Sequence, residues 1–186
     1  MHNATLQFMR TFLRRPLATG SILPSSRFLA QRMVSAIEWD RAQVIVELGP
    51  GRGCITREIL DRMQSNAVLI AIDTNPQFTA GLRESLADSR LRVVTGSAIQ
   101  IKHELSQAGF THADCIISGL PFVNMPPDLR RGIVLECSQA LADRGKLILF
   151  QYRTLLLPLL REVFSSVSGE FEWRNLPPAF VFCCSE

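Results

Sequence analysis

The first 37 residues of this chain contain no aspartate or glutamate. The formal net charge of the whole chain is only +3, so the residues after this stretch are net negative and the positive charge is concentrated at the front. A local cationic surface attracts anionic partners such as a membrane surface or a nucleic acid. Its cationic residues are five arginines: Arg10, Arg14, Arg15, Arg27 and Arg32.

Long apolar runs and paired cysteines are also missing. No run reaches the roughly 18 apolar residues that a membrane-spanning helix needs. Arginines also interrupt the apolar residues of the front end, which argues against a secretory signal. The five cysteines form no CxxC pair, which favours buried thiols in a reducing compartment over disulfides, and we expect no metal site. The length of 186 residues fits a single cytoplasmic domain over 1–186, with an N-terminal helical segment 1–38 and a core 40–186.

After residue 40, short apolar runs alternate with stretches of helical spacing. The runs at 42–49, 67–73, 91–96, 114–119 and 146–152 predict strands, and the stretches at 54–63, 76–87, 97–109, 126–145 and 153–167 predict helices. Continuous apolar strands separated by helices are typical of a parallel sheet covered on both faces. Residues 170–184 predict an antiparallel hairpin. The predicted fold is therefore α/β, a doubly wound, mostly parallel seven-stranded sheet with a C-terminal hairpin and N-terminal helices.

A glycine-rich loop, "ELGPGRG", follows the first predicted strand and places Gly49, Gly51 and Gly53 at alternate positions. Glycines at such a turn let a ligand approach the main chain. The dinucleotide fingerprint GxGxxG would require a glycine where Cys54 stands, so a pyrophosphate site is not favoured. The second strand ends in Asp73, whose carboxylate suits the two hydroxyls of a ribose.

This loop and the acid of "AIDTNP" resemble the cofactor site of class I S-adenosylmethionine-dependent methyltransferases. The resemblance implies that Glu47 and the three glycines line the methionine side, that Asp73 holds the ribose, and that Asn75 lines the adenosine side. In this family an acid often follows the third strand, where this chain has Ser97 and Ala98. Ser97 either bonds the adenine or caps the next helix. Ser118, which ends the fourth strand, completes the expected cofactor set.

The loop "SGLPF" after the fourth strand indicates the acceptor. Enzymes that methylate the exocyclic amine of a base have Asn or Asp where this chain has Gly119, but Pro121 and Phe122 are kept. Together with the opening "RRPLATGSILPSS" and the closing "NLPPAFVF", this loop resembles the bacterial phospholipid N-methyltransferases, relatives of the rRNA adenine dimethylases. The resemblance covers essentially the whole chain and implies N-methylation of phosphatidylethanolamine.

Several side chains are candidates for the acceptor side. An aromatic face favours a cationic product, so Phe122, Tyr152 and Trp173 are candidates, each with core packing as the alternative. Tyr152 is the strongest because it follows a strand end. Arg153 or the five front arginines would hold the lipid phosphate.

The front end predicts two helices. Leu6, Met9 and Leu13 share one face of the first, whereas "PSS" supplies N-caps for "RFLAQRMVSAI". Both helices would cover the cofactor pocket and dock on an anionic membrane surface, peripherally on its inner face; ordinary lid helices are the alternative. An rRNA adenine methyltransferase, a small-molecule methyltransferase and a non-catalytic membrane-binding protein remain alternative functions, with nucleic acid disfavoured by Gly119. The oligomeric state stays open.

Overall fold

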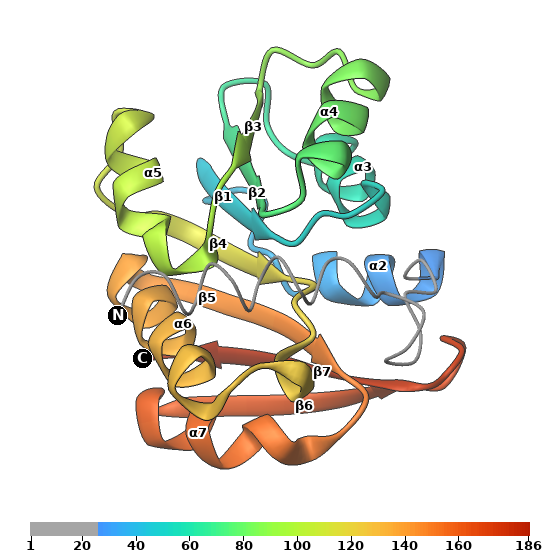
Figure 1. Cartoon of the computed structure of the whole chain (residues 1–186), viewed down its shortest axis with the longest axis vertical. Coiled ribbons are helices and arrows are strands. Elements are labelled where there is room, and N and C mark those ends of the chain that lie inside the picture. Colours follow the sequence, from blue (N-terminus) through green and yellow to red (C-terminus); the bar gives the residue numbers. More distant parts are fainter. Residues whose placement is uncertain (1–25) are drawn as a thin grey trace.

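The computed structural model describes residues 26–186, which form one seven-stranded sheet with helices on both faces (Figure 1). The strand order is β3-β2-β1-β4-β5-β7-β6. In chain order the strands are β1 Val44–Leu48, β2 Val68–Asp73, β3 Leu91–Thr95, β4 Ala113–Ser118, β5 Leu141–Gln151, β6 Ser166–Glu172 and β7 Ala179–Ser185. Strands β1 to β5 pair in parallel, and β7 pairs antiparallel with both β5 and β6. The predicted fold class is confirmed.

Within the described residues, six α-helices and three 3-10 turns accompany these strands. The helices are α2 Arg27–Val34, α3 Cys54–Leu60, α4 Pro76–Ser85, α5 Ile101–Gln107, α6 Pro127–Ala140 and α7 Leu157–Val163; the turns are η1 Ala98–Gln100, η2 Phe122–Asn124 and η3 Thr154–Leu156. The longest helix in this part of the chain, α6, has 14 residues, too few to cross a bilayer.

Two apolar clusters hold the sheet between its helices. All five residues of β1 are buried, because one face of the strand packs on α2 and α3 and the other on α5, α6 and α7. Val46 and Leu48 point to the second group of helices, whereas Ile45 points to the first. This double burial explains why the strand has a continuous apolar sequence instead of an alternating one.

Helix α2 is part of this core. The N–H of Leu29 donates to Ser26 Oγ (3.2 Å), which confirms the predicted N-cap in "PSS". Leu29 and Met33 are fully buried against α3 and the sheet, so α2 stabilises the fold as a packed core helix. The first predicted helix, with Arg10, Arg14 and Arg15, lies outside the described residues.

The predicted boundaries differ from the structure around α6 and β5. The sequence predicts a helix as far as 145, but α6 ends at Ala140 and β5 begins at Leu141. Arg144 has φ 66°, and a Cβ on Gly145 would lie 2.8 Å from the Ala142 carbonyl oxygen. The start of β5 is therefore irregular, with a register shift against β4 between Leu141 and Lys146, and a side chain at position 145 would clash; helical spacing in the sequence does not reveal this. At the far end, α7 stops at Val163 instead of reaching 167.

Candidate functional site

The glycine loop joins β1 to α3 and is the framework of the site. Gly49, Gly51 and Gly53 have φ values of 71°, 54° and 79°, in the left-handed region that favours glycine. A Cβ on Gly53 would lie 2.6 Å from Cδ2 of Leu82 in α4, so any other residue at this position would force the buried Leu82 side chain to shift. All three glycines are thus favoured by the backbone conformation of the loop, and Gly53 is also required by close packing, whereas a Cβ on Gly51 would meet no described atom within 4 Å.

Glu47 lies beneath this loop with an unusual hydrogen-bonding state. The side chain is 1% exposed, and Thr56 Oγ1 donates to its Oε2 (2.7 Å). Its other oxygen, Oε1, is buried and has no hydrogen-bond partner among the described residues. Burial raises the pKa of Glu47 to about 7 from its usual 4.5; the Thr56 hydrogen bond opposes this and the charge of Asp73 adds to it. A buried acceptor without a partner is costly, so this oxygen is suited to a ligand donor.

Asp73 closes the other side of the loop. Its Oδ2 accepts from Gly51 N–H (3.3 Å) and its Oδ1 from Asn75 N–H (2.8 Å). Burial raises the pKa of Asp73, whereas these backbone N–H groups lower it. Asn75 Oδ1 caps α4 by accepting from Gln77 N–H (2.9 Å). The structure therefore brings the glycine loop, Glu47 and Asp73 together as predicted.

Ser97 and Ala98 follow β3 at the same edge of the sheet. Gly96 N–H donates to the Asp73 carbonyl oxygen (3.0 Å), which sets the start of this loop beside the end of β2. Ser97 Oγ caps η1 by accepting from Ile99 N–H at 3.5 Å, and Ala98 is buried. The capping role is thus present in the structure, and contact with an adenine stays a prediction.

The lack of a side chain at Gly119 has a structural cause that the sequence does not reveal. Its N–H donates to the Leu48 carbonyl oxygen (2.8 Å), and a Cβ on it would lie 3.0 Å from the Gly49 carbonyl oxygen. The loop after β4 therefore packs backbone to backbone against the glycine loop. Ser118 is fully buried, and its Oγ accepts from Leu120 N–H (3.3 Å).

Gln151, the last residue of β5, was missed by the sequence analysis. It is 6% exposed, and its Nε2 donates to the Leu120 carbonyl oxygen (3.0 Å), which also accepts from Phe122 N–H (2.9 Å). The amide thereby fixes the loop after β4 to the end of β5. A polar residue that ends an otherwise apolar strand was the available signal.

The predicted aromatic residues occupy different surroundings. The Phe122 ring is 1% exposed and packs in the core with α6 and α7. Core packing, the alternative role stated for this residue, is therefore what the structure shows. Contact with an acceptor would require the ring to leave the core. Tyr152 is half-buried, with its ring edge-on to Phe150 at 5.7 Å between centroids. Burial raises the pKa of Tyr152, and a hydrogen bond with Asn175 of the β6–β7 connection lowers it. Trp173 is 72% exposed.

The described arginines of the predicted lipid contact also differ from one another. Arg27 and Arg153 are exposed. Arg32 is engaged within the protein: its Nη1 lies 2.6 Å from Glu170 Oε2 and its Nε 3.4 Å from Glu172 Oε2. Arg32 therefore ties α2 to β6 instead of being available for a lipid phosphate.

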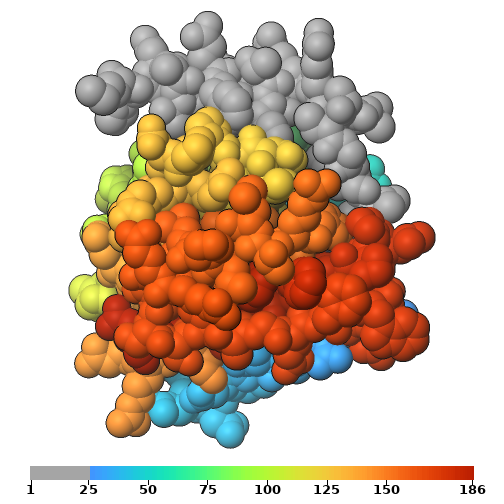
Figure 2. All heavy atoms as spheres, turned by 90° about the horizontal axis from the view of Figure 1, so that it is seen from below, coloured from blue at the N-terminus to red at the C-terminus, as the bar shows by residue number. Residues whose placement is uncertain are grey.

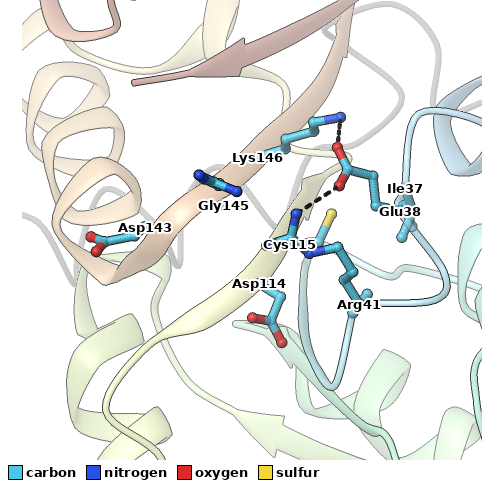
Figure 3. Close-up of a pocket in the computed structure, with 10 residues that line it drawn as sticks. Ile37, Glu38, Arg41, Asp114, Cys115, Asp143, Gly145 and Lys146 are labelled. Carbon is cyan, nitrogen blue, oxygen red and sulfur yellow. Dashed lines mark ion pairs between the residues drawn. The ribbon is translucent and has the colours of Figure 1, made fainter.

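A separate hollow lies at the opposite edge of the sheet, between the turn after α2 and the amino ends of β4 and β5 (Figure 3). Its charges are used internally, since Glu38 pairs with Lys146 (2.5 Å) and Arg41 (3.8 Å). Asp114 Oδ2 accepts from two backbone N–H groups, those of residues 43 and 44. Ligands of open α/β sheets bind at the carboxyl ends of the strands, so this hollow is not part of the site.

The fold and this site have counterparts among known proteins. The family model described as methyltransferase small domain matches residues 18–172. The chain belongs to this family. It is 35% identical to an ornithine lipid N-methyltransferase of Singulisphaera acidiphila, over 95% of this chain and 93% of that protein. A small-subunit rRNA methyltransferase A of Thermobifida fusca is 29% identical over 61% of this chain, which spans 44% of that protein's length.

Solved structures share the fold. The 1,6-didemethyltoxoflavin-N1-methyltransferase of Burkholderia thailandensis, solved with S-adenosylhomocysteine, has a TM-score of 0.72 and 15% identity; all of this chain and 90% of that one are covered. The predictions of a methyltransferase and of S-adenosylmethionine as its methyl donor are confirmed. Within residues 26–186 no cluster of three or more His, Cys, Asp or Glu side chains could hold a metal ion.

Proposed function

We propose that this methyltransferase transfers a methyl group to the primary amine of a membrane lipid head group. The observation that carries the proposal is the alignment, over nearly the full length of both chains, with an ornithine lipid N-methyltransferase. Ornithine lipid and phosphatidylethanolamine, the acceptor implied by the sequence resemblance, both pair a primary amine with an anionic group. Ornithine lipid is the first acceptor to test and phosphatidylethanolamine the second.

The cofactor site is suited to S-adenosylmethionine. The buried Oε1 of Glu47 is an acceptor for the amino group of the methionine part, and Asp73 accepts from the ribose hydroxyls. Ser97 and Ala98 would border the adenine. Once bound, the cofactor supplies an electrophilic methyl group on its sulfonium. The glycine loop contributes backbone that lets the ligand approach closely, and the packing of Gly119 on Gly49 fixes where the acceptor loop begins.

The chain's task on the acceptor side is alignment. The amine lone pair forms the N–C bond as the S–C bond breaks, and the amine proton leaves to water. Gln151 holds the loop after β4 in place by its hydrogen bond to the Leu120 carbonyl. Tyr152 stands just beyond the end of β5, at the same edge, and Arg153 offers an exposed cation for the anionic group of the lipid.

Methylation of an rRNA adenine is the second candidate, because the rRNA methyltransferase relatives match this chain. Gly119 counts against it, since it provides no side-chain acceptor for a flat exocyclic amine. The close approach to Gly49 leaves little room for one. We propose that nucleic acid is not a substrate and that an anionic membrane surface, the inner face of the cytoplasmic membrane, is the partner.

Methyl-labelled S-adenosylmethionine tests the proposal when it is offered with separate acceptor pools. One pool holds vesicles with ornithine lipid, a second vesicles with phosphatidylethanolamine, a third rRNA and a fourth small amines. Label in either lipid pool supports the proposal and identifies the acceptor. Label in rRNA or in small amines, with none in lipid, contradicts it.

A further inference from the structure

The exposed apolar residues of this protein are gathered at one edge of the sheet. Within residues 26–186 the large hydrophobic side chains that are most exposed are Ile99, Val123, Leu155, Phe171, Trp173 and Leu176. The first three follow β3, β4 and β5, and the last three lie at or near the β6–β7 connection. Gln151, which ends β5, pairs with Phe180 near the start of β7, so that connection lies at the carboxyl edge as well.

The opposite edge has a different character. Charged side chains line the hollow of Figure 3, among them Glu38 and Arg41 from the turn after α2 and Lys146 from β5. None of the strongly exposed hydrophobic residues in the described part of the chain lies there. The apolar edge is thus also the edge that carries the glycine loop and Asp73.

The two most exposed of these residues lie in one short loop. Trp173 is 72% exposed and Leu176 is 78% exposed, and both lie in the connection between β6 and β7, hereafter the hairpin tip (residues 173–178). The hairpin tip projects from the body of the protein (Figure 1), and atoms in the red part of the colour range lie at the right-hand margin of Figure 2. Two bulky apolar side chains displayed in this way on a loop are typical of an interaction site.

Hydrogen bonds and ion pairs hold the hairpin tip in place. Glu172, which is fully buried, accepts from Arg174 through both of its oxygens (2.8 and 2.9 Å) and pairs with Arg32 of α2. The Arg174 guanidinium lies over the Phe28 ring at 4.7 Å. Asn175 is buried, and its Oδ1 accepts from Ser26 N–H (3.1 Å). These contacts fix the hairpin tip to α2, so the exposure of its apolar side chains is a property of the fold.

Arginine side chains lie near the hairpin tip. Arg27 is exposed beside Phe28, with its guanidinium 5.5 Å from the ring centroid, and Arg153 is exposed beyond the end of β5. Tryptophan prefers the boundary between lipid head groups and acyl chains, and arginine pairs with phosphate. Apolar side chains bordered by arginines therefore match an anionic bilayer better than the surface of another protein.

We propose that the hairpin tip inserts Trp173 and Leu176 into an anionic phospholipid bilayer and so directs the carboxyl edge of the sheet toward the membrane. This rests on the proposed lipid substrate and adds the surface through which the enzyme reaches it. With that orientation the lipid head group would meet the methyl-donor site without leaving the bilayer. The charged amino edge would face water.

Tryptophan fluorescence tests the insertion directly. The chain has two tryptophans, so Trp39→Phe leaves Trp173 as the only emitter. With vesicles of equal parts phosphatidylcholine and phosphatidylglycerol, the Trp173 emission should shift to the blue and be quenched by brominated acyl chains. The double variant Trp173→Ser/Leu176→Ser should bind these vesicles at least about tenfold more weakly, whereas Trp173→Phe/Leu176→Ile should keep binding within about threefold. Calorimetric cofactor binding shows whether each variant is folded.

Three results would overturn the insertion. These are no vesicle binding by the unmodified protein, vesicle binding without a change in Trp173 emission, and a double variant that loses self-association in equilibrium sedimentation but binds vesicles as before. The last result would make the hairpin tip a contact between two copies of the chain. If Trp173 inserts but no lipid is methylated, the insertion stands and the proposed function fails. If lipid is methylated but Trp173 does not insert, the proposed function stands and the insertion fails.

Discussion

Replacing Glu47 by glutamine should change how the stability of the protein depends on pH. In the folded protein without cofactor the pKa of Glu47 is about 7, against its usual 4.5, because the carboxyl group is buried. The folded state therefore binds a proton more tightly than the unfolded state, so the free energy of unfolding falls as pH rises from about 4.5 through 7. A difference of this size corresponds to about 3 kcal/mol. Glutamine at 47 has no such dependence.

Urea denaturation of the cofactor-free protein at pH 5 and pH 8 measures this effect. Relative to the unmodified protein, Glu47→Gln should gain about 3 kcal/mol in unfolding free energy between these two pH values. Thr56→Val is the matched control, because it removes the hydrogen bond to the Glu47 carboxylate but keeps the ionisable group. It should keep the pH dependence or make it steeper. The same stability difference between Glu47→Gln and the unmodified protein at both pH values would refute the argument.

Cofactor binding should report on the same carboxyl group. An amino group placed against Glu47 Oε1 favours the charged carboxylate and lowers its pKa, so binding near pH 7 should release a fraction of a proton. Calorimetry in two buffers of different ionisation enthalpy measures that release. Glu47→Gln should abolish it, and an unchanged release would place the ammonium elsewhere.

Three further predictions concern the framework of the site. Asp73→Ala should weaken cofactor binding by about 1–3 kcal/mol in calorimetry, because the ribose hydroxyls lose their acceptor. The affinity of Asp73→Asn should lie between those of Asp73→Ala and the unmodified protein. Equal affinity in all three proteins would mean that Asp73 does not contact the cofactor. Gly53→Ala should lower the unfolding free energy by about 2 kcal/mol or more, because its Cβ meets Leu82. Gly51→Ala should cost only about 1 kcal/mol, because no described atom lies within 4 Å of its Cβ. Denaturation curves that give equal losses for the two variants would contradict the packing argument. Gln151→Leu should lower kcat more than it lowers cofactor affinity, and the opposite split would mean that it supports the cofactor side instead.

The positions of the glycine loop and Asp73 in the candidate site could be predicted from the sequence because their constraints are local. A strand, three alternating glycines and an acid at the end of the next strand specify the loop and Asp73 through neighbouring backbone alone. The order of strands and helices was predictable for the same reason, since apolar continuity marks strands buried on both faces.

The surroundings of the loop after β4, which the sequence resemblance assigns to the acceptor, depend on contacts between distant segments. The sequence shows that Gly119 lacks a side chain, but only the structure shows that Gly49 packs against it. An aromatic residue after a strand looks the same whether it lines a pocket or, like Phe122, fills the core. Arg32 looks available on a helical face until Glu170 and Glu172 are brought opposite it by the far end of the chain.

Mass spectrometry of the lipid after the reaction tests the central claim most directly. The protein is incubated with S-adenosylmethionine and vesicles that contain ornithine lipid, and the head-group fragment is analysed. The account predicts a mass gain of one or more CH2 units located on the amine nitrogen, and no gain when that amine is acetylated beforehand. Phosphatidylethanolamine vesicles are treated in parallel. The account is contradicted if both lipids stay unmodified while the same preparation methylates rRNA or a small amine.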